Sequence, residues 1–107
     1  MERIVIACYK PKPGKAKELK ALVRKHHTEL LKEGLVTARK PVLMQGVDGT
    51  VVEVFEWKSS QAMKDAHQNE AVQQMWQEFS EVSDYLPVGQ VPEGQQLFSE
   101  FLPLKDR

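Results

Sequence analysis

The fold of this chain is decided by Asp48-Gly-Thr-Val-Val-Glu-Val-Phe-Glu-Trp57, a run of β-branched and aromatic residues that follows a turn-forming pair. Such residues are enriched in strands, so the run predicts a strand over residues 50–57. The pair Asp48-Gly49 favours a two-residue hairpin turn, which would pair Val47 with Thr50.

The partner strand before this turn is expected over residues 36–47. Pro41 interrupts it, which indicates an edge position or a bulge, because proline donates no ladder hydrogen bond. At the N-terminus, residues 3–9 read Arg-Ile-Val-Ile-Ala-Cys-Tyr and predict a strand that is buried on both faces. The sequence Lys-Pro-Lys-Pro-Gly then ends that strand.

Two helices are expected beside these strands. Residues 14–33 carry apolar side chains at helical spacing, and Gly34 follows where a helix C-terminus favours glycine. A second helix begins after Ser59 or Ser60, either of which can cap it. Its apolar stripe changes phase at Asn69-Glu70, which predicts a kink or a break there.

The C-terminal part is expected to hold a loop over residues 86–94 and a last strand over residues 96–102. The order strand, helix, strand, strand, helix, strand is typical of an α+β, ferredoxin-like domain with a four-stranded antiparallel sheet. Both helices would cover the same sheet face. Because the strands over 3–9 and 50–57 are apolar on both sides, the second face also needs a cover, which a symmetric homodimer would provide.

The composition supports a single domain over residues 1–107. A chain of 107 residues and 12.2 kDa buries about two-thirds of its unfolded surface, enough for one core. Its 15 basic and 15 acidic residues give no net charge, which disfavours nucleic acid as a partner. The single cysteine, Cys8, leaves no internal disulfide and no cysteine-based zinc site. No apolar run reaches the ~20 residues of a membrane span, so we expect a cytoplasmic protein with no membrane partner.

Three stretches carry a family resemblance that covers nearly the whole chain: Tyr9-Lys-Pro-Lys-Pro-Gly14, Asp48-Gly-Thr-Val-Val-Glu-Val-Phe-Glu-Trp57 and Ser59-Ser-Gln-Ala-Met-Lys-Asp-Ala-His67. The chain resembles the antibiotic biosynthesis monooxygenase-like family of dimeric α+β barrel proteins. The resemblance implies a homodimer in which each sheet and its own helices enclose a mostly apolar pocket. In characterised members this pocket oxidises phenolic or quinol-type substrates with dioxygen and no cofactor, degrades haem, or serves in signalling.

The haem-degrading branch of this family does not fit the sequence. The resemblance would require an Asn in the first strand, a Trp in the second helix and a ligand His ten residues later. These positions hold Ala7, Ala66 and Trp76, or His67 and Gln77 in place of the last two after a one-residue slip. Neither register supplies an imidazole for iron, so no cofactor is expected.

The predicted catalytic residues are His67, His26 and Tyr9. Histidine has an ordinary pKa near neutrality, which suits a base that deprotonates a phenol or quinol before dioxygen reacts. His67 borders the apolar stripe of the second helix and is the predicted base, but a histidine bonded at a pocket rim or a dimer seam shows the same pattern. His26 and His27 flank the first stripe on opposite sides, so one would reach the sheet and the other solvent. As helix neighbours they do not chelate one metal, and no metal is expected. Tyr9 would orient a substrate oxygen.

Four aromatic side chains and one carboxylate are the predicted substrate-binding residues. They are Trp57, Trp76, Phe55, Phe79 and Glu53. Aromatic walls suit a planar ring, although the spacing of all four aromatic residues also fits an ordinary core or a dimer interface. Glu53 would either pair at the dimer seam or point into the pocket.

Two functions of different classes follow from these residues. The first is a cofactor-free, monooxygenase-like enzyme acting on an aromatic small molecule, with His67 as the base and His26 and Tyr9 as its helpers. The second is a non-catalytic dimeric ligand-binding or stress-response protein, which the lack of a recognisable acid–base pair in the sequence favours. An isomerase or lyase on the same scaffold would also use one base but would consume no oxygen.

Overall fold

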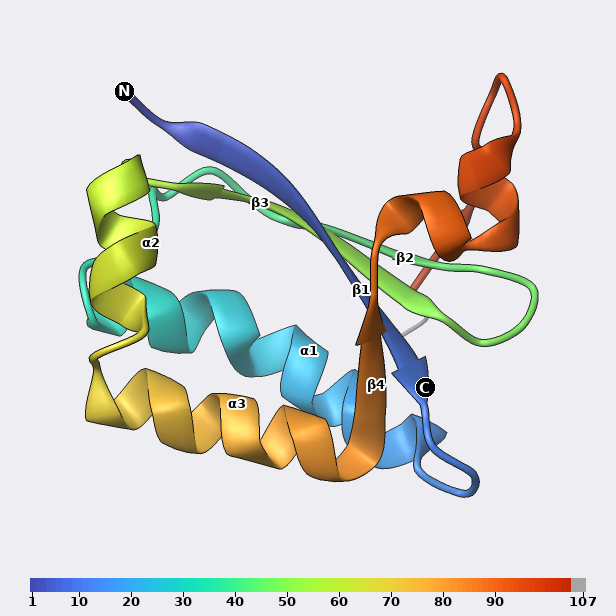
Figure 1. Ribbon diagram of the computed structural model, residues 1–107, viewed down its shortest axis with the longest axis horizontal. Coiled ribbons are helices and arrows are strands. Elements are labelled where there is room, and N and C mark those ends of the chain that lie inside the picture. Colours follow the sequence, from blue (N-terminus) through green and yellow to red (C-terminus); the bar gives the residue numbers. More distant parts are fainter. Residues whose placement is uncertain (105–107) are drawn as a thin grey trace.

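A computed structural model describes residues 1–104, which form one antiparallel sheet with three α-helices on the same side of it (Figure 1). The strands are β1 (Arg3–Pro11), β2 (Val42–Gln45), β3 (Val51–Trp57), β4 (Ser83–Leu86) and β5 (Leu102–Pro103). The helices are α1 (Ala16–Lys32), α2 (Ser60–Ala66) and α3 (Glu70–Val82), and two 3₁₀ turns, η1 (Val88–Gln90) and η2 (Pro92–Gln95), follow β4. The predicted α+β class is confirmed.

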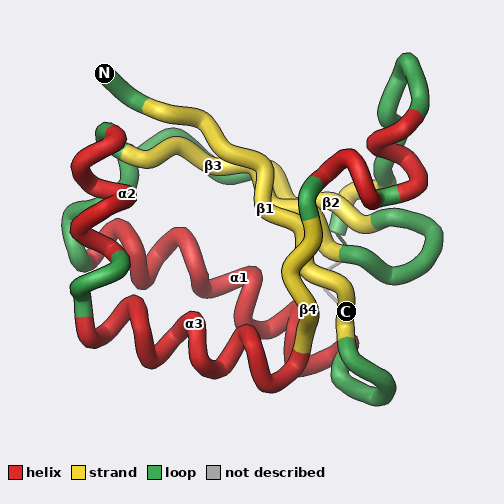
Figure 2. The backbone as a smooth tube through the Cα atoms, in the orientation of Figure 1, coloured by secondary structure: helices red, strands yellow, loops and turns green. Residues whose placement is uncertain are grey.

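The sheet has five strands in the order β4-β1-β3-β2-β5, and every neighbouring pair is antiparallel. The longest pairing joins β1 to β3, from Arg3 opposite Trp57 to Tyr9 opposite Val51. Figure 2 shows α1 and α3 running antiparallel beneath these strands, with α2 at one end. The central strand β3 is therefore flanked by strands on both sides and packed against helices, which makes it the most buried part of the sheet.

The predicted last strand over residues 96–102 is wrong, and so is the count of four strands. Only Leu102 and Pro103 pair there, at the outer edge of β2, while β4 pairs with the end of β1. The backbone becomes extended at Ser83, whose hydroxyl donates to the Phe79 carbonyl at 2.8 Å and ends α3. β4 has only four residues and directly follows the apolar stripe of α3. It is therefore too short to show the alternation of apolar and polar residues by which a strand is recognised in a sequence.

The predicted two-residue turn between β2 and β3 is also wrong, because the hairpin loop has three residues. The Gly46 N–H donates to the Thr50 carbonyl at 2.8 Å, so these two residues close the hairpin. Gly49 adopts φ 91°, the left-handed conformation that glycine tolerates, and its N–H donates to the Gly46 carbonyl at 3.1 Å. Asp48 Oδ1 accepts from the Thr50 N–H at 2.9 Å. Asp48 and Gly49 therefore lie in the turn as predicted, but the residue paired with Thr50 is Gly46 and not Val47.

The predicted helix boundaries agree better with the structure. The helix predicted over residues 14–33 is α1, Ala16–Lys32; Gly34 follows its C-cap residue Glu33 and adopts φ 73°, as its predicted C-terminal role requires. The predicted break at Asn69 is confirmed, since α2 ends before it and the Asn69 side chain accepts from the Val72 N–H at 3.1 Å to cap α3. Ser59 caps α2 in the same way through the Ala62 N–H at 3.0 Å. Both caps satisfy backbone donors that a helix start leaves without partners.

The two sheet faces are covered differently. On the helix side, one core cluster joins the sheet to all three helices and includes Tyr9, Phe55 and Phe79. On the opposite face, Cys8 and Val52 are buried beneath Val91, which belongs to the segment that contains η1 and η2. Figure 1 shows this segment on the side of the sheet away from the helices. The chain therefore covers part of its second apolar face by itself.

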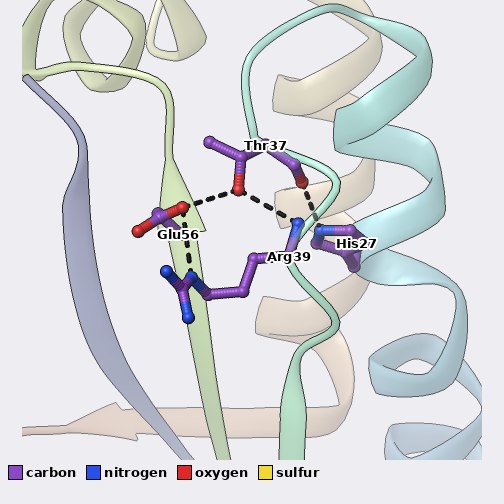
Figure 3. A network of polar contacts seen from close by, with 4 residues as sticks. All are labelled: His27, Thr37, Arg39 and Glu56. Carbon is purple, nitrogen blue, oxygen red and sulfur yellow. Dashed lines mark hydrogen bonds and ion pairs between the residues drawn. The ribbon is translucent and has the colours of Figure 1, made fainter.

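A polar network ties the connection after α1 to β3 (Figure 3). The Thr37 hydroxyl donates to Glu56 Oε1 at 2.8 Å, and Arg39 Nε lies 3.3 Å from the same oxygen. His27 Nε2 lies 3.0 Å from the Thr37 carbonyl oxygen, so α1 joins the network from the other side. These contacts give His27 a structural position at the edge of the sheet.

No helix within residues 1–104 is long and apolar enough to cross a membrane.

Candidate functional site

The candidate site is a buried polar cluster between the centre of the sheet and α1. Glu53, in the middle of β3, has no exposed surface. Its Oε1 accepts from the Tyr9 hydroxyl at 2.9 Å and lies 2.8 Å from His26 Nδ1. Three residues from β1, α1 and β3 therefore meet at one carboxylate oxygen.

Strand alternation and helix periodicity bring these residues together. Tyr9 follows Val5 and Ala7 on the helix side of β1, and Glu53 follows Val51 on the helix side of β3. Ala7 pairs with Glu53 in the sheet register, which places Tyr9 one pleat further along the neighbouring strand. The buried stripe of α1 continues through His26 and points the imidazole at the same face. The remaining members of that stripe are Leu19, Leu22, Val23 and Leu30.

Aromatic rings enclose the cluster. Phe79 of α3 stacks on Tyr9 with ring centroids 4.8 Å apart and meets the edge of His26 at 5.0 Å. Phe55 of β3 contacts His26 edge-on at 5.5 Å. Such apolar walls exclude water, and hydrogen bonds in a medium of low dielectric are electrostatically stronger than in water.

The Tyr9 hydroxyl is held as a hydrogen-bond donor. Burial raises the pKa of Tyr9 far above its ordinary value, and the charge of Glu53 and the hydrogen bond to it raise the pKa further. The phenol therefore stays protonated at physiological pH and does not act as a base. In the neutral tautomer that donates from Nδ1 to Glu53, the lone pair of the imidazole lies on Nε2.

Two atoms of the cluster have no hydrogen-bond partner among the described residues. They are His26 Nε2 and Glu53 Oε2, and both are buried. Leaving a buried polar atom unpaired costs about 1–3 kcal/mol, so proteins keep such atoms mainly where a ligand or water pairs with them. A neutral imidazole backed by a carboxylate, with its second nitrogen free, is the arrangement of a general base.

An open cavity of about 320 Å³ lies beside this cluster. It is lined by Tyr9, Gln73, Trp76, Gln77, Ser80 and Tyr85. Tyr9 belongs to both the cavity and the polar cluster, whereas His26 and Glu53 are not among the lining residues. The cavity is near the lower end of the volumes typical of small-molecule sites and has three aromatic residues in its wall.

The structure separates the sequence-predicted residues into two groups. His26, Tyr9, Glu53, Phe55 and Phe79 come together in the buried cluster.

His67 and the two tryptophans lie outside that cluster. His67 is exposed at the C-terminal end of α2, and its ring meets Trp76 edge-on at 5.1 Å. Trp76 also lines the cavity. Trp57 packs on Phe55 with ring centroids 5.3 Å apart.

The pairing of Glu53 with His26 is the feature that the sequence did not reveal. The sequence predicts Glu53 within an apolar strand and His26 beside the apolar stripe of a helix. Both placements are confirmed, because Glu53 lies in β3 and His26 is among the buried residues of α1. The polar cavity residues Gln73, Gln77 and Ser80 were also missed, since glutamine and serine on a helix have the pattern of a solvated surface. Within residues 1–104, no three His, Cys, Asp or Glu side chains group as metal ligands would.

Compared with models of protein families, with curated proteins and with solved structures, the chain gives no match in any of the three searches. The family resemblance therefore remains a hypothesis, and the function has to be argued from the site.

Proposed function

We propose that this chain is a cofactor-free, acid–base enzyme with monooxygenase-like chemistry on a small phenol- or quinol-type molecule. The observation that supports this most directly is the Glu53 Oε1 atom, shared by His26 Nδ1 at 2.8 Å and the Tyr9 hydroxyl at 2.9 Å. A histidine with a buried carboxylate partner is oriented in one tautomer and is stabilised when it takes up a proton.

His26 is the proposed base in this scheme, in place of His67. His26 is buried and bonded to Glu53, whereas the His67 ring is exposed and makes none of the hydrogen bonds found within residues 1–104. The phenolic O–H of the substrate would give its proton to His26 Nε2, and Glu53 would stabilise the resulting imidazolium. Because Nε2 is buried and His26 does not line the cavity, this step requires the enclosing side chains to move aside when the substrate binds. Tyr9 would remain protonated and hold the carboxylate in place. His67, beside Trp76, would border the substrate cavity.

The overall reaction needs no added reductant. The substrate phenolate donates electrons to dioxygen, one oxygen atom enters the ring at a C–H carbon, and the ring becomes a quinone. The second oxygen atom leaves as water, together with the hydrogens of the former O–H and C–H bonds. The four electrons that reduce dioxygen all come from the substrate, so the balance closes without a flavin or a metal.

The test is oxygen uptake over a panel of quinols and polycyclic phenols, with the variants His26→Gln and Glu53→Gln. We expect uptake by the wild type, and a loss of about 10²–10⁴-fold in His26→Gln, which is the usual contribution of a positioned acid–base group. His67→Gln is the matched control and should keep most of the activity. If His67→Gln loses the activity and His26→Gln keeps it, the base is His67 and the present assignment is overturned.

A second candidate is a ligand-binding protein without catalysis. It is favoured by one observation: His26 and Glu53 are not among the residues that line the cavity beside Tyr9. An aromatic ligand could then stack on Trp76 and Tyr85 without reaching the imidazole. Ligand-induced thermal stabilisation with no oxygen uptake and no isomerised product would support this second candidate.

We also propose that the chain forms a homodimer in which two ferredoxin-like domains pack through their helix-free sheet faces. Strands β1, β2, β3 and β4 with α1 and the α2–α3 pair follow the order of that fold, and β5 is an addition at the edge. Ile4, Ile6 and Val42 remain exposed on the helix-free face. Contiguous apolar surface on a sheet is typical of an interface.

A further inference from the structure

A second cavity lies at the end of the β2–β3 hairpin and shares no lining residue with the cavity beside Tyr9. Its volume is about 340 Å³, and it is lined by Gln45, Val47, Glu93, Glu100, Phe101 and Leu102. These residues come from β2, the hairpin loop, η2, the segment before β5 and β5 itself. The proposed chemistry at His26 does not use any of them.

Glu93 is the unusual residue of this cavity. Its side chain is 7% exposed, and its Oε2 accepts from the Val47 N–H at 2.8 Å. Its Oε1 has no hydrogen-bond partner among the described residues. A buried carboxylate with one neutral donor is poorly compensated, because a buried charge ordinarily has an opposite charge or several hydrogen bonds.

The hairpin is shaped to admit this carboxylate. A Cβ atom added to Gly46 would lie 2.9 Å from Glu93 Oε1 and 3.3 Å from Oε2, so the carboxylate would have to shift to make room for it. The φ of Gly46 is not positive, so its backbone conformation does not itself demand glycine. The absence of a side chain at residue 46 therefore leaves room for the Glu93 carboxylate in its present position.

The cavity lining is suited to a cation. Two carboxylates, Glu93 and Glu100, and the amide of Gln45 supply acceptors, and none of the lining residues within 1–104 is a lysine or arginine. The Phe101 ring and the apolar side chains of Val47 and Leu102 supply contact for an alkyl chain. A carboxylate oxygen that lacks a donor and an aromatic ring beside it are a common combination for holding an ammonium group.

We propose that this cavity binds the primary ammonium group of a small organic amine. The ammonium N–H groups donate to the Glu93 carboxylate, Glu100 adds a second negative charge at the entrance, and the alkyl part lies against Phe101 and Leu102. The site is independent of the proposed oxygenation chemistry, so either proposal can fail without the other.

The test is an NMR titration of the ¹⁵N-labelled protein with n-butylammonium chloride at constant ionic strength. The Val47 amide is the reporter, since its N–H donates to Glu93. We expect a saturable shift of the Val47 resonance with n-butylammonium and none with n-butanol, its uncharged counterpart. Glu93→Gln should weaken binding at least tenfold, and Glu100→Gln, at an exposed residue, several-fold.

Glu81→Gln is the matched control, because Glu81 is an exposed carboxylate on α3 outside the cavity, and it should bind as the wild type does. A titration without a saturable shift at Val47 overturns the proposal. So does an equal response to n-butanol, wild-type affinity in Glu93→Gln, or, where Glu93→Gln does not fold, wild-type affinity in Glu100→Gln. Since Glu100→Gln changes an exposed side chain, the test stands even if Glu93→Gln fails to fold.

Discussion

Tyr9 and Tyr85 make hydrogen bonds of similar length in very different surroundings, which allows a matched comparison at the scale of single residues. The Tyr9 hydroxyl donates to the buried Glu53 carboxylate at 2.9 Å, while that of Tyr85 donates to the Trp76 carbonyl at 3.2 Å on an exposed residue. Tyr9→Phe removes a hydrogen-bond donor to the buried Glu53 side chain and should lower the free energy of unfolding by about 1–3 kcal/mol.

Tyr85→Phe should change the free energy of unfolding by less than about 0.5 kcal/mol, because water replaces an exposed partner. Urea unfolding of both variants at one pH and one ionic strength measures the difference. Equal losses in the two variants would show that the Tyr9 bond has no special role in holding Glu53.

The sequence identified the residues of the polar cluster more readily than their contacts. Tyr9, His26 and Glu53 each stand out by residue type within an apolar pattern. Their contacts join positions 44 and 27 residues apart, so they depend on the β1–β3 register and on where α1 packs. His67 was equally recognisable by its residue type. It lies just beyond the last residue of α2, Ala66, and its ring contacts Trp76 instead of the polar cluster. Local pattern decides which side chain is buried, and tertiary packing decides what it meets.

At the scale of elements, the segment over residues 88–95 acts as a strap across the helix-free face. Val91 is completely buried in this strap, packed with Cys8 and Val52. Burial also raises the pKa of the Cys8 thiol, which slows its reaction with thiol reagents near neutral pH. Cys8 is therefore a reporter of whether the strap is closed.

Val91→Ala should loosen the strap. The loss of two methyl groups corresponds to about 1.6 kcal/mol of buried apolar contact. If this loss lowers the free energy of local opening of the strap by the same amount, labelling of Cys8 by a thiol reagent becomes roughly tenfold faster. Val47→Ala, at an exposed residue, is the control and should label at the wild-type rate. An unchanged rate in Val91→Ala would mean that Cys8 is protected by the sheet alone.

Elements with caps or long stripes were predictable, and short ones were not. The break at Asn69 and the end of α1 at Gly34 follow from local chemistry that the sequence displays directly. In contrast, β4 and β5 have four and two residues and owe their strand conformation to the neighbouring edges of β1 and β2. A strand whose conformation depends on pairing with its neighbours shows little strand pattern in its own residues, so it is hard to predict from sequence.

At the scale of the whole molecule, the strap divides the helix-free face into a covered and an open half. Cys8 pairs with Val52 in the covered half, and Ile6 pairs with Val54 in the next row of the open half. Val42 continues that row on β2, opposite Val54. Ile6 and Val42 are each 53% exposed. The row thus presents β-branched side chains from three adjacent strands to solvent, whereas Glu56, which pairs with Ile4, is buried.

A row of exposed apolar side chains on a sheet resembles the apolar centre of a protein interface. If two copies pack through it, the wild type should have the mass of a dimer by light scattering at micromolar concentration. Ile6→Lys would bury a charge at the centre of the interface and should raise the dissociation constant at least a hundredfold, leaving a folded monomer. Val47→Lys, at the exposed tip of the hairpin, should remain dimeric. A monomeric wild type would remove this face as the site of self-association and leave the open row for a different partner.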